Sequence, residues 1–174
     1  MLTGPRVTLR ALEPTDIGFL LRLENDPALW DAGDTRVPYS RYALEQYIER
    51  AATEDLWAVR QVRFVMGTGP QGARAAGVLD VFDVAPGHRR AAVGIALLPE
   101  ARGQGIATEA LDLLHTYATT ALHLHQLYCG VATTNAASLR LFRRAGYTEI
   151  GLRRQWLLEI GGAWGDVIDF QRIL

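Results

Sequence analysis

The chain of 174 residues is 49% apolar and 21% charged, as is typical of a soluble globular protein with one sizeable core. Its formal net charge of -1 excludes a general basic surface for nucleic acid or an anionic membrane, and no apolar run approaches the roughly 20 residues of a membrane-spanning helix. The single cysteine excludes an intrachain disulfide framework and fits a reducing compartment. We therefore expect a cytoplasmic protein with one domain over residues 1–174 and no nucleic-acid or membrane partner.

The first third of the chain predicts one strand followed by two helices. Residues 6–12 (RVTLRAL) alternate and favour a strand, and residues 13–26 favour a helix with a proline near its first turn. Residues 25–40 have the Pro, Asp and Gly content of a loop. Ser40 can cap a second helix. Its apolar residues recur at helical spacing: Leu44, Tyr47, Ile48 and Ala51.

The middle of the chain predicts three strands. Residues 56–66 and 76–84 form the arms of a hairpin around the glycine-rich residues 67–75. Residues 89–98 (RRAAVGIALL) are apolar on both faces, which predicts a strand inside a sheet.

The next segment predicts helix, strand and helix. A helix runs to about Leu122, and residues 126–132 (QLYCGVA) form a short strand. Asn135 can cap a helix over residues 136–145, and Gly146 can end it.

The C-terminal residues predict a hairpin of residues 151–160 and 163–173, with Gly161-Gly162 as a two-residue turn. The expected order is β-α-α-β-β-β-α-β-α-β-β. This order defines an α/β domain with a mixed sheet.

Two glycines precede a well-specified helix in the stretch PEARGQGIATEAL. A loop that leaves a buried strand and opens a helix presents free N–H groups, which together with the helix dipole can bind an anion. Gly103 and Gly105 let a phosphate approach, and Thr108 adds a hydroxyl. The pattern Arg102-x-x-Gly105-x-Ala107 is neither a Walker A loop nor a complete dinucleotide fingerprint. The alternative is an ordinary strand-to-helix turn.

A second signature lies downstream, in NAASLRLFRRAGY over residues 135–147. With this signature and the glycine loop, nearly the whole chain resembles the GNAT acyltransferases, which move an acetyl group from acetyl-CoA to an amine. Residues 7–16 and 88–95 resemble the RimJ/RimL branch and its spermidine/diamine acetyltransferases. The resemblance implies an α+β fold with a mixed central sheet and the cofactor in a cleft between two splayed parallel strands. We also expect a homo-oligomer, a dimer or larger.

The resemblance also implies which residues bind acetyl-CoA. Backbone N–H groups of the loop would cradle the pyrophosphate: Arg102, Gly103, Gln104, Gly105, Ile106, Ala107 and Thr108. The pantetheine arm would pair like a strand with Ile95, Ala96 and Leu97. Asn135 would hold the cofactor's amide end, and Arg140 or Arg143 would extend toward the cofactor. A solvated basic helix face is the alternative for Arg143 and Arg144.

Acetyl transfer to an amine needs a proton acceptor for the amine, a polarised thioester carbonyl and a partner for the departing thiolate. Many GNAT enzymes protonate the thiolate with a tyrosine, where this chain has Phe142. Ser138, one turn earlier on the same face, is the candidate partner; its alternative is a first-turn serine bonded to the helix backbone. Tyr147 is a weaker candidate, with core packing as the alternative. Direct transfer needs no covalent enzyme intermediate, so Cys129 need not be a nucleophile and is expected in the core, and no metal site is expected.

The amine side lacks the glutamate of related polyamine enzymes, which is Ala92 in this chain. Asp83 is the candidate that binds or deprotonates the amine, and Asp80, on the opposite strand face if alternation holds, is the weaker choice. The alternative for both is a solvated carboxylate paired with Arg89 or Arg90. His88 is expected to be a turn residue.

The first two helices and their loop are expected to close the acceptor pocket. An acidic, aromatic mouth suits a cationic amine. The candidate substrate-binding residues are Glu24, Trp30, Asp31, Asp34, Tyr39 and Asp83.

Three functions are consistent with these residues. The first is acetyl-CoA-dependent acetylation of a small or polyamine-like amine by direct transfer. The second is acetylation of a protein N-terminus, as the RimJ/RimL resemblance allows. The third is a CoA-binding module with little turnover, for which Phe142 and Ala92 argue.

Overall fold

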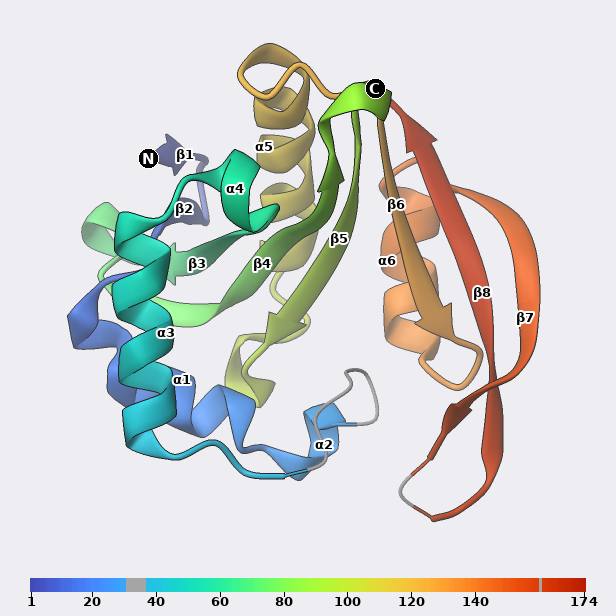
Figure 1. Cartoon of the computed structure of the whole chain (residues 1–174), viewed down its shortest axis with the longest axis horizontal. Coiled ribbons are helices and arrows are strands. Elements are labelled where there is room, and N and C mark those ends of the chain that lie inside the picture. The colour runs from blue at the N-terminus through green and yellow to red at the C-terminus, as the bar shows by residue number, and fades with distance from the viewer. Residues whose placement is uncertain (31–36, 160) are drawn as a thin grey trace.

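The computed structural model describes residues 1–30, 37–159 and 161–174, and these residues form one eight-stranded mixed sheet (Figure 1). The strand order is β1-β2-β3-β4-β5-β6-β8-β7, and neighbours are antiparallel except for β5 and β6. The strands are β1 (Leu2–Thr3), β2 (Thr8–Ala11), β3 (Val62–Thr68), β4 (Arg74–Ala85), β5 (Arg90–Leu97), β6 (Gln126–Ala132), β7 (Thr148–Leu158) and β8 (Trp164–Ile173). This arrangement is the fold predicted from the sequence.

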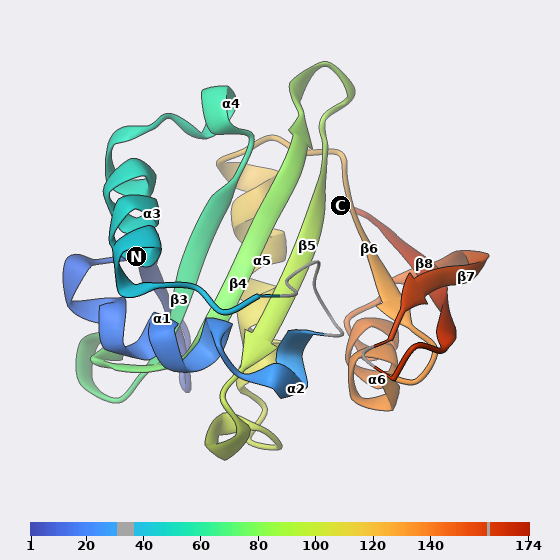
Figure 2. The ribbon, with the colours of Figure 1, turned by 60° about the horizontal axis from the view of Figure 1, so that its bottom comes forward.

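Helices cover both faces of the sheet (Figures 1 and 2). On one face, α1 (Ile17–Glu24) and α3 (Arg41–Thr53) bury Leu20, Leu23, Leu44 and Ile48 against β3 and β4. On the other face, α5 (Ile106–Thr120) and α6 (Ala136–Arg144) pack on the sheet. We call the face under α1 and α3 the acceptor face.

Local capping explains where the predicted helices begin and end. The Ser40 hydroxyl accepts from the Ala43 N–H at 3.1 Å, which caps α3. The Asn135 side chain accepts from the Ser138 N–H at 3.0 Å, which caps α6. Gly146 follows α6 with φ at +80°, a conformation that favours glycine. These three predictions are confirmed.

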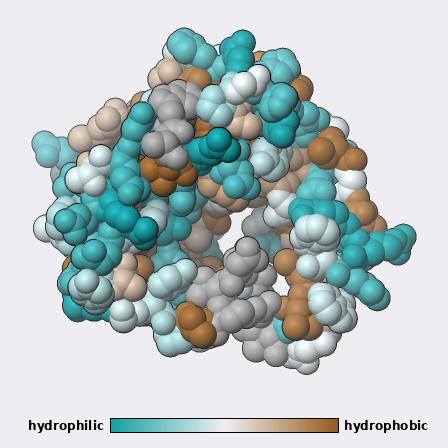
Figure 3. Space-filling view, viewed as in Figure 1, coloured by the Kyte–Doolittle hydropathy of each residue, from teal (hydrophilic) through white to brown (hydrophobic). Residues whose placement is uncertain are grey.

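The parallel pair β5–β6 separates along its length. The two strands pair only at Arg90–Gln126, Ala91–Leu127 and Ala92–Tyr128. Beyond these positions each strand keeps only its other neighbour, β4 or β8. Figure 1 shows the two strands diverging, and Figure 3 shows the surface hollowed between them and the helices of the acceptor face. The predicted splay of the two parallel strands is confirmed.

Residues 56–59 correct one prediction, because they form α4 (Leu56–Val59) and not the start of a strand. The Arg60 N–H donates to the Leu56 carbonyl at 2.6 Å, and Arg60 then takes a positive φ of 58° that turns the chain into β3. The predicted loop after α1 also contains a short helix, α2 (Pro27–Trp30). The two residues of β1 had no sequence prediction.

The C-terminal hairpin turn is longer than the two glycines predicted. Glu159 exchanges backbone hydrogen bonds with two residues: its N–H donates to Ala163, and its carbonyl accepts from Gly162, each at 2.9 Å. Gly162 has φ at +83°. This geometry matches a longer hairpin loop with a left-handed residue before the returning strand.

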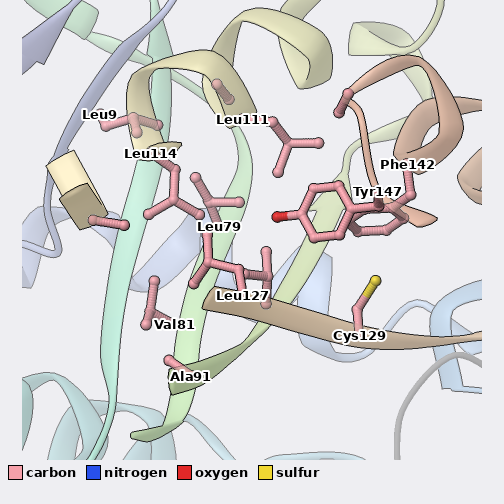
Figure 4. Close-up of a cluster of buried hydrophobic side chains, with 14 of the residues drawn as sticks. Leu9, Leu79, Val81, Ala91, Leu111, Leu114, Leu127, Cys129, Phe142 and Tyr147 are labelled. Atoms are coloured by element: carbon pink, nitrogen blue, oxygen red, sulfur yellow. The ribbon is translucent and has the colours of Figure 1, made fainter. Parts of the chain in front are cut away.

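The larger core lies between the sheet and the helices α5 and α6 (Figure 4). Leu79, Leu111, Leu114 and Leu127 are fully buried there. Among the described helices, none combines the length and apolar character that a membrane crossing requires.

Candidate active site

The glycine loop places a row of N–H groups at the start of α5. Gly103 and Gly105 have φ at +74° and +78°, and Gly105 is the N-cap residue of α5. The first helical N–H with an acceptor is that of Glu109, which donates to Gly105 at 3.1 Å. The earlier N–H groups of the helix have no acceptor among the described residues, as helix geometry dictates. An anion is the natural partner for them.

The loop glycines are required by backbone conformation. A Cβ at Gly103 would meet nothing within 4 Å, and one at Gly105 would meet only the Arg6 side chain at 3.9 Å. The positive φ therefore favours glycine at these positions, where the described protein atoms cause no crowding. Close approach of a ligand, the reason suggested by the sequence pattern, stays a prediction.

Two side chains of the loop bind the protein's own backbone. Arg102 Nε donates to the Leu97 carbonyl at 3.2 Å, and Gln104 Nε2 donates to the Glu100 carbonyl at 2.7 Å. Ile106 is buried in the core, whereas Thr108 is exposed. Ile106 can therefore offer a ligand only its backbone.

The splayed strands offer free backbone edges beside this loop. Ile95, Ala96 and Leu97 are half-buried, and among the described residues they pair with β4 but not with β6. An extended chain with amide groups can pair with such an edge. The cleft and the loop together fit the pantetheine arm and the pyrophosphate of CoA.

At the start of α6, the predicted residues have different surroundings. Asn135 Oδ1 is occupied by the helix cap, and the cap uses the backbone of Ser138. The Ser138 hydroxyl is half-buried and has no hydrogen-bond partner among the described residues. Arg140 is exposed, while Arg143 forms an ion pair with Glu149 at 2.6 Å. Ser138 is thus free to bind a ligand, and its role stays a prediction.

Phe142 faces the core. It is 3% exposed, and its ring meets Tyr147 edge-on at 5.0 Å between centroids. The Tyr147 hydroxyl lies 3.2 Å from His115 Nε2, and burial raises the pKa of Tyr147. Burial, with a smaller contribution from Arg172, lowers the pKa of His115 to about 4. Figure 4 shows both rings within the buried cluster, so neither Phe142 nor Tyr147 is placed to protonate a thiolate.

Cys129 is also part of this buried cluster (Figure 4). Burial and the nearby Asp169 carboxylate raise the pKa of its thiol to about 12. A thiol with this pKa is inert as a nucleophile at neutral pH.

Asp83 stands on a bulge in β4. The β4–β5 register shifts between Phe82 and Ala85, and Asp83 has a positive φ of 49°. The extra residue lets Val84 return to the core while Asp83 lies beside Phe82 in a cavity of about 470 Å³. Asp83 therefore shares the acceptor face with Phe82, because the bulge breaks the simple alternation expected for β4.

The Asp83 cavity lies where β5 and β6 are paired. It is lined by Val59, Arg60, Gln61, Phe82, Asp83, Val84, Ala85, Arg90 and Tyr128. Burial and the Asp83 carboxylate raise the pKa of Tyr128, which records the proximity of these two groups. Asp83 forms no ion pair with Arg89 or Arg90 among the described contacts.

A second acidic group on the acceptor face contains an arginine that the sequence did not single out. Arg63 binds Asp80 through Nε at 2.7 Å and Nη2 at 2.9 Å, and it binds Glu24 through Nη1 at 2.5 Å. We call Glu24, Arg63 and Asp80 the charge cluster. Burial alone would lower the pKa of Arg63, but the charge and hydrogen bonds of Asp80 outweigh burial and raise it. The sequence signal for this cluster was a charged residue, Arg63, within the otherwise apolar stretch VRFVM.

The predicted pocket mouth is built around the end of α1. Trp30 Nε1 donates to the Glu24 carbonyl at 2.9 Å. The Asn25 side chain accepts from the Tyr39 N–H at 2.7 Å and donates to the Tyr39 carbonyl at 3.0 Å. These hydrogen bonds hold Glu24, Trp30 and Tyr39 near the end of α1. The other two predicted residues, Asp31 and Asp34, lie outside the described residues.

Comparison with known proteins identifies the class of protein that this loop, cleft and sheet define. A family model described as an acetyltransferase (GNAT) domain matches residues 6–148, so the chain belongs to the GNAT acetyltransferases. It is an N-acetyltransferase that uses acetyl-CoA.

Several similar proteins are named as spermidine acetyltransferases, and another is named as a probable N-acetyltransferase. The spermidine N(1)-acetyltransferase of Escherichia coli K12 is 29% identical over 87% of this chain and 77% of its own length. The probable N-acetyltransferase YjcK of Bacillus subtilis is 29% identical over 95% of this chain and 93% of its own. A crystal structure of spermidine N-acetyltransferase from Vibrio cholerae in complex with CoA and spermine is 26% identical, with a TM-score of 0.85 over 98% of this chain and 96% of that one.

Proposed function

We propose that this single acetyltransferase domain transfers the acetyl group of acetyl-CoA directly to a small, polyamine-like cationic amine. The observation that carries this proposal is that Asp80 and Asp83 flank Phe82 on β4, the strand that borders β5, with Asp80 in the charge cluster and Asp83 in a cavity that Arg60 and Arg90 also line. Asp83 is exposed, whereas Glu24 and Asp80 are mostly buried, and carboxylates at such positions attract an ammonium group. The relatives named as spermidine acetyltransferases support the same substrate class. We also propose that the chain stands in the RimJ/RimL branch.

In the proposed reaction, the N–H groups of residues 103–108 hold the cofactor phosphates, and the edge of β5 orients the pantetheine arm. When bound, acetyl-CoA supplies the activated acetyl group. Asp83 attracts the ammonium group and accepts a proton from it directly or through water. Ser138 donates a hydrogen bond to the sulfur as it departs, whereas Phe142 packs in the core and the Tyr147 hydroxyl contacts His115. The cytoplasmic location expected from the sequence stays a prediction.

Replacing Asp83 by Asn tests the acceptor assignment, because it keeps the side-chain shape and removes the charge. We expect kcat/KM for diamines and polyamines to fall on the order of tenfold to a thousandfold, the range for one charged or general-base contact, with CoA affinity unchanged. Thiol release measured over a panel of amines and peptide N-termini, with mass spectrometry of the products, provides the readout.

Three outcomes of this panel contradict the proposal. Full activity of Asp83→Asn on amines removes Asp83 from the acceptor site. Acetylation of peptide N-termini alone makes the protein a protein acetyltransferase. Binding of CoA with no turnover on any acceptor makes it a CoA-binding module.

We also propose that the protein is a homo-oligomer. The edge strand β7 and its partner β8 expose Ile150, Leu152, Trp156, Leu158 and Trp164, each more than two-fifths exposed. Apolar side chains gathered on a sheet edge mark an association surface. A structure of the Vibrio cholerae spermidine N-acetyltransferase with 25% identity and a TM-score of 0.78 is described as dodecameric.

A further inference from the structure

The charge cluster holds one more carboxylate than it holds cations. Arg63 in β3 lies directly across from Asp80 in β4, binds both of its oxygens, and uses a third donor for Glu24 at the end of α1. The side chains of Glu24, Arg63 and Asp80 are 20%, 15% and 14% exposed. Water therefore screens these charges poorly. The formal net charge of the cluster is -1, from two carboxylates and one guanidinium.

The charge cluster borders the opening of the cofactor cleft. Asp80 pairs in register with Gly94 of β5, the residue immediately before Ile95. A Cβ at Gly94 would lie 3.8 Å from the Asp80 Cβ and 3.4 Å from the Phe82 ring. An amine that approaches the cleft from the acceptor face therefore passes beside the cluster.

Arg63 occupies the place that a substrate cation would otherwise take. A guanidinium and an alkylammonium group both donate charge-assisted hydrogen bonds to carboxylates. The Arg63 guanidinium also lies 5.2 Å from the centre of the Tyr47 ring, a contact that favours any cation at this position. Arg63 thus satisfies sites that could hold a second ammonium group of a long polyamine.

We propose that Arg63 is a built-in cation that limits how many positive charges the acceptor pocket accepts, and that the net charge of Glu24, Arg63 and Asp80 sets the selectivity among amines. This inference rests on the proposed function. The wild-type cluster supports one ammonium group beside Glu24. A second ammonium group at the same place is repelled by Arg63.

Variants that change the cluster's net charge in steps provide the test. The measured quantity is the ratio of kcat/KM for a linear aliphatic tetraamine to that for a diamine. Arg63→Met gives the cluster a charge of -2, and the ratio is expected to rise on the order of tenfold, as for one added charged hydrogen bond. Glu24→Gln gives a charge of 0, and the ratio is expected to fall by a similar factor. The double variant restores -1, and its ratio is expected to return to within about twofold of wild type.

A matched control is the exposed ion pair of Arg22 with Glu100, whose side chains are 64% and 58% exposed. Arg22→Met and Glu100→Gln should leave the ratio unchanged, because solvent screens this pair. If all cluster variants instead lower kcat/KM for every amine by one factor, Arg63 is only a structural ion-pair partner and the proposal is overturned.

Two further points keep the test decisive. Should Arg63→Met fail to fold, an unchanged ratio for Glu24→Gln overturns the inference by itself. Calorimetry of the two amines on CoA-loaded protein measures the preference as a ratio of affinities, independently of turnover, and this ratio is expected to change in the same direction. If the wild-type protein acetylates no amine, the proposed function is contradicted. If the ratio of affinities does not change with the charge of the cluster, only this inference is contradicted.

Discussion

Gly105 is the residue on which phosphate binding is predicted to depend most directly. We expect Gly105→Ala to lower the free energy of unfolding by about 1–2 kcal/mol, the cost of a left-handed non-glycine residue, and to weaken CoA binding at least tenfold as the loop N–H groups shift. Calorimetry with CoA and denaturant unfolding measure the two effects.

Gly162 supplies the matched control for this substitution. It has a similar φ of +83°, its Cβ would meet nothing within 4 Å, and it lies in the far hairpin turn. Gly162→Ala should carry the same strain and bind CoA normally. Equal CoA affinity in both variants would remove the pyrophosphate from this loop.

Ser138 can be changed without disturbing the helix cap, because the cap uses its backbone N–H. We expect Ser138→Ala to lower kcat, by on the order of a hundredfold if the hydroxyl acts on the thiolate, and to change the KM for acetyl-CoA little. Steady-state kinetics measures both constants. Asn135→Ala is the contrasting variant, since losing the cap should cost about 1 kcal/mol of stability. Unchanged turnover in Ser138→Ala would assign protonation of the thiolate to solvent.

For single residues, the predictions from sequence succeeded where local backbone geometry alone determines the structure. The caps of α3 and α6 and the glycines at positive φ follow from local chemistry, so a single sequence contains their signal. The sheet face on which Asp83 lies depends on a β-bulge. The hydrogen bond from Arg63 to Glu24 joins β3 to the end of α1. Such contacts depend on register and packing, which local patterns do not contain.

At the scale of elements, α5 is joined to the chain after α6 by a buried polar contact. His115 is 7% exposed and lies 3.2 Å from the Tyr147 hydroxyl, and its pKa is lowered from 6.5 to about 4. The folded protein therefore binds fewer protons than the unfolded chain between these values. The stability from neutral His115 is fully present above pH 6.5 and is lost as the pH falls toward 4. At 1.36 kcal/mol for each pKa unit, this corresponds to about 3 kcal/mol.

The prediction is tested by denaturant unfolding between pH 7 and 4. His115→Gln keeps a hydrogen-bonding side chain and cannot titrate, so it should flatten this part of the stability profile. His88→Gln, at an exposed turn, should leave the profile as in wild type. A wild-type slope that persists in His115→Gln would assign the pH dependence to other groups.

The elements themselves were largely predictable, with failures at short or boundary segments. Apolar spacing identified α1 and α3, helix-forming residues after the glycine loop identified α5, the caps Asn135 and Gly146 identified α6, and apolar strand character placed β5 inside the sheet. The one-turn helix α4 was taken for strand because Leu56–Val59 is apolar and too short to show a helical period. The two residues of β1 are likewise too few for any pattern.

At the scale of the whole molecule, the exposed face of β7 and β8 predicts association. We expect Trp156→Arg to dissociate the homo-oligomer, since Trp156 is 57% exposed on the sheet edge and a charge there opposes burial. Sedimentation velocity measures the mass. Tyr42→Arg, 70% exposed on α3, is the control that should keep the wild-type mass. A wild-type protein that sediments as a monomer would contradict the proposal directly.

The paired hydrogen bonds between Asn25 and Tyr39 have a consequence for how the acceptor side can change. They close the base of the segment between α1 and α3, so that its two ends are fixed to each other by the Asn25 side chain and the backbone N–H and carbonyl of Tyr39. Closing a longer flexible loop costs only slightly more free energy than closing a shorter one. A change in chain length between Asn25 and Tyr39 is therefore expected to leave the geometry of the sheet and the cofactor cleft unchanged, because these hydrogen bonds fix the two ends. New acceptor preferences can arise by evolution in this segment at little cost to the fold.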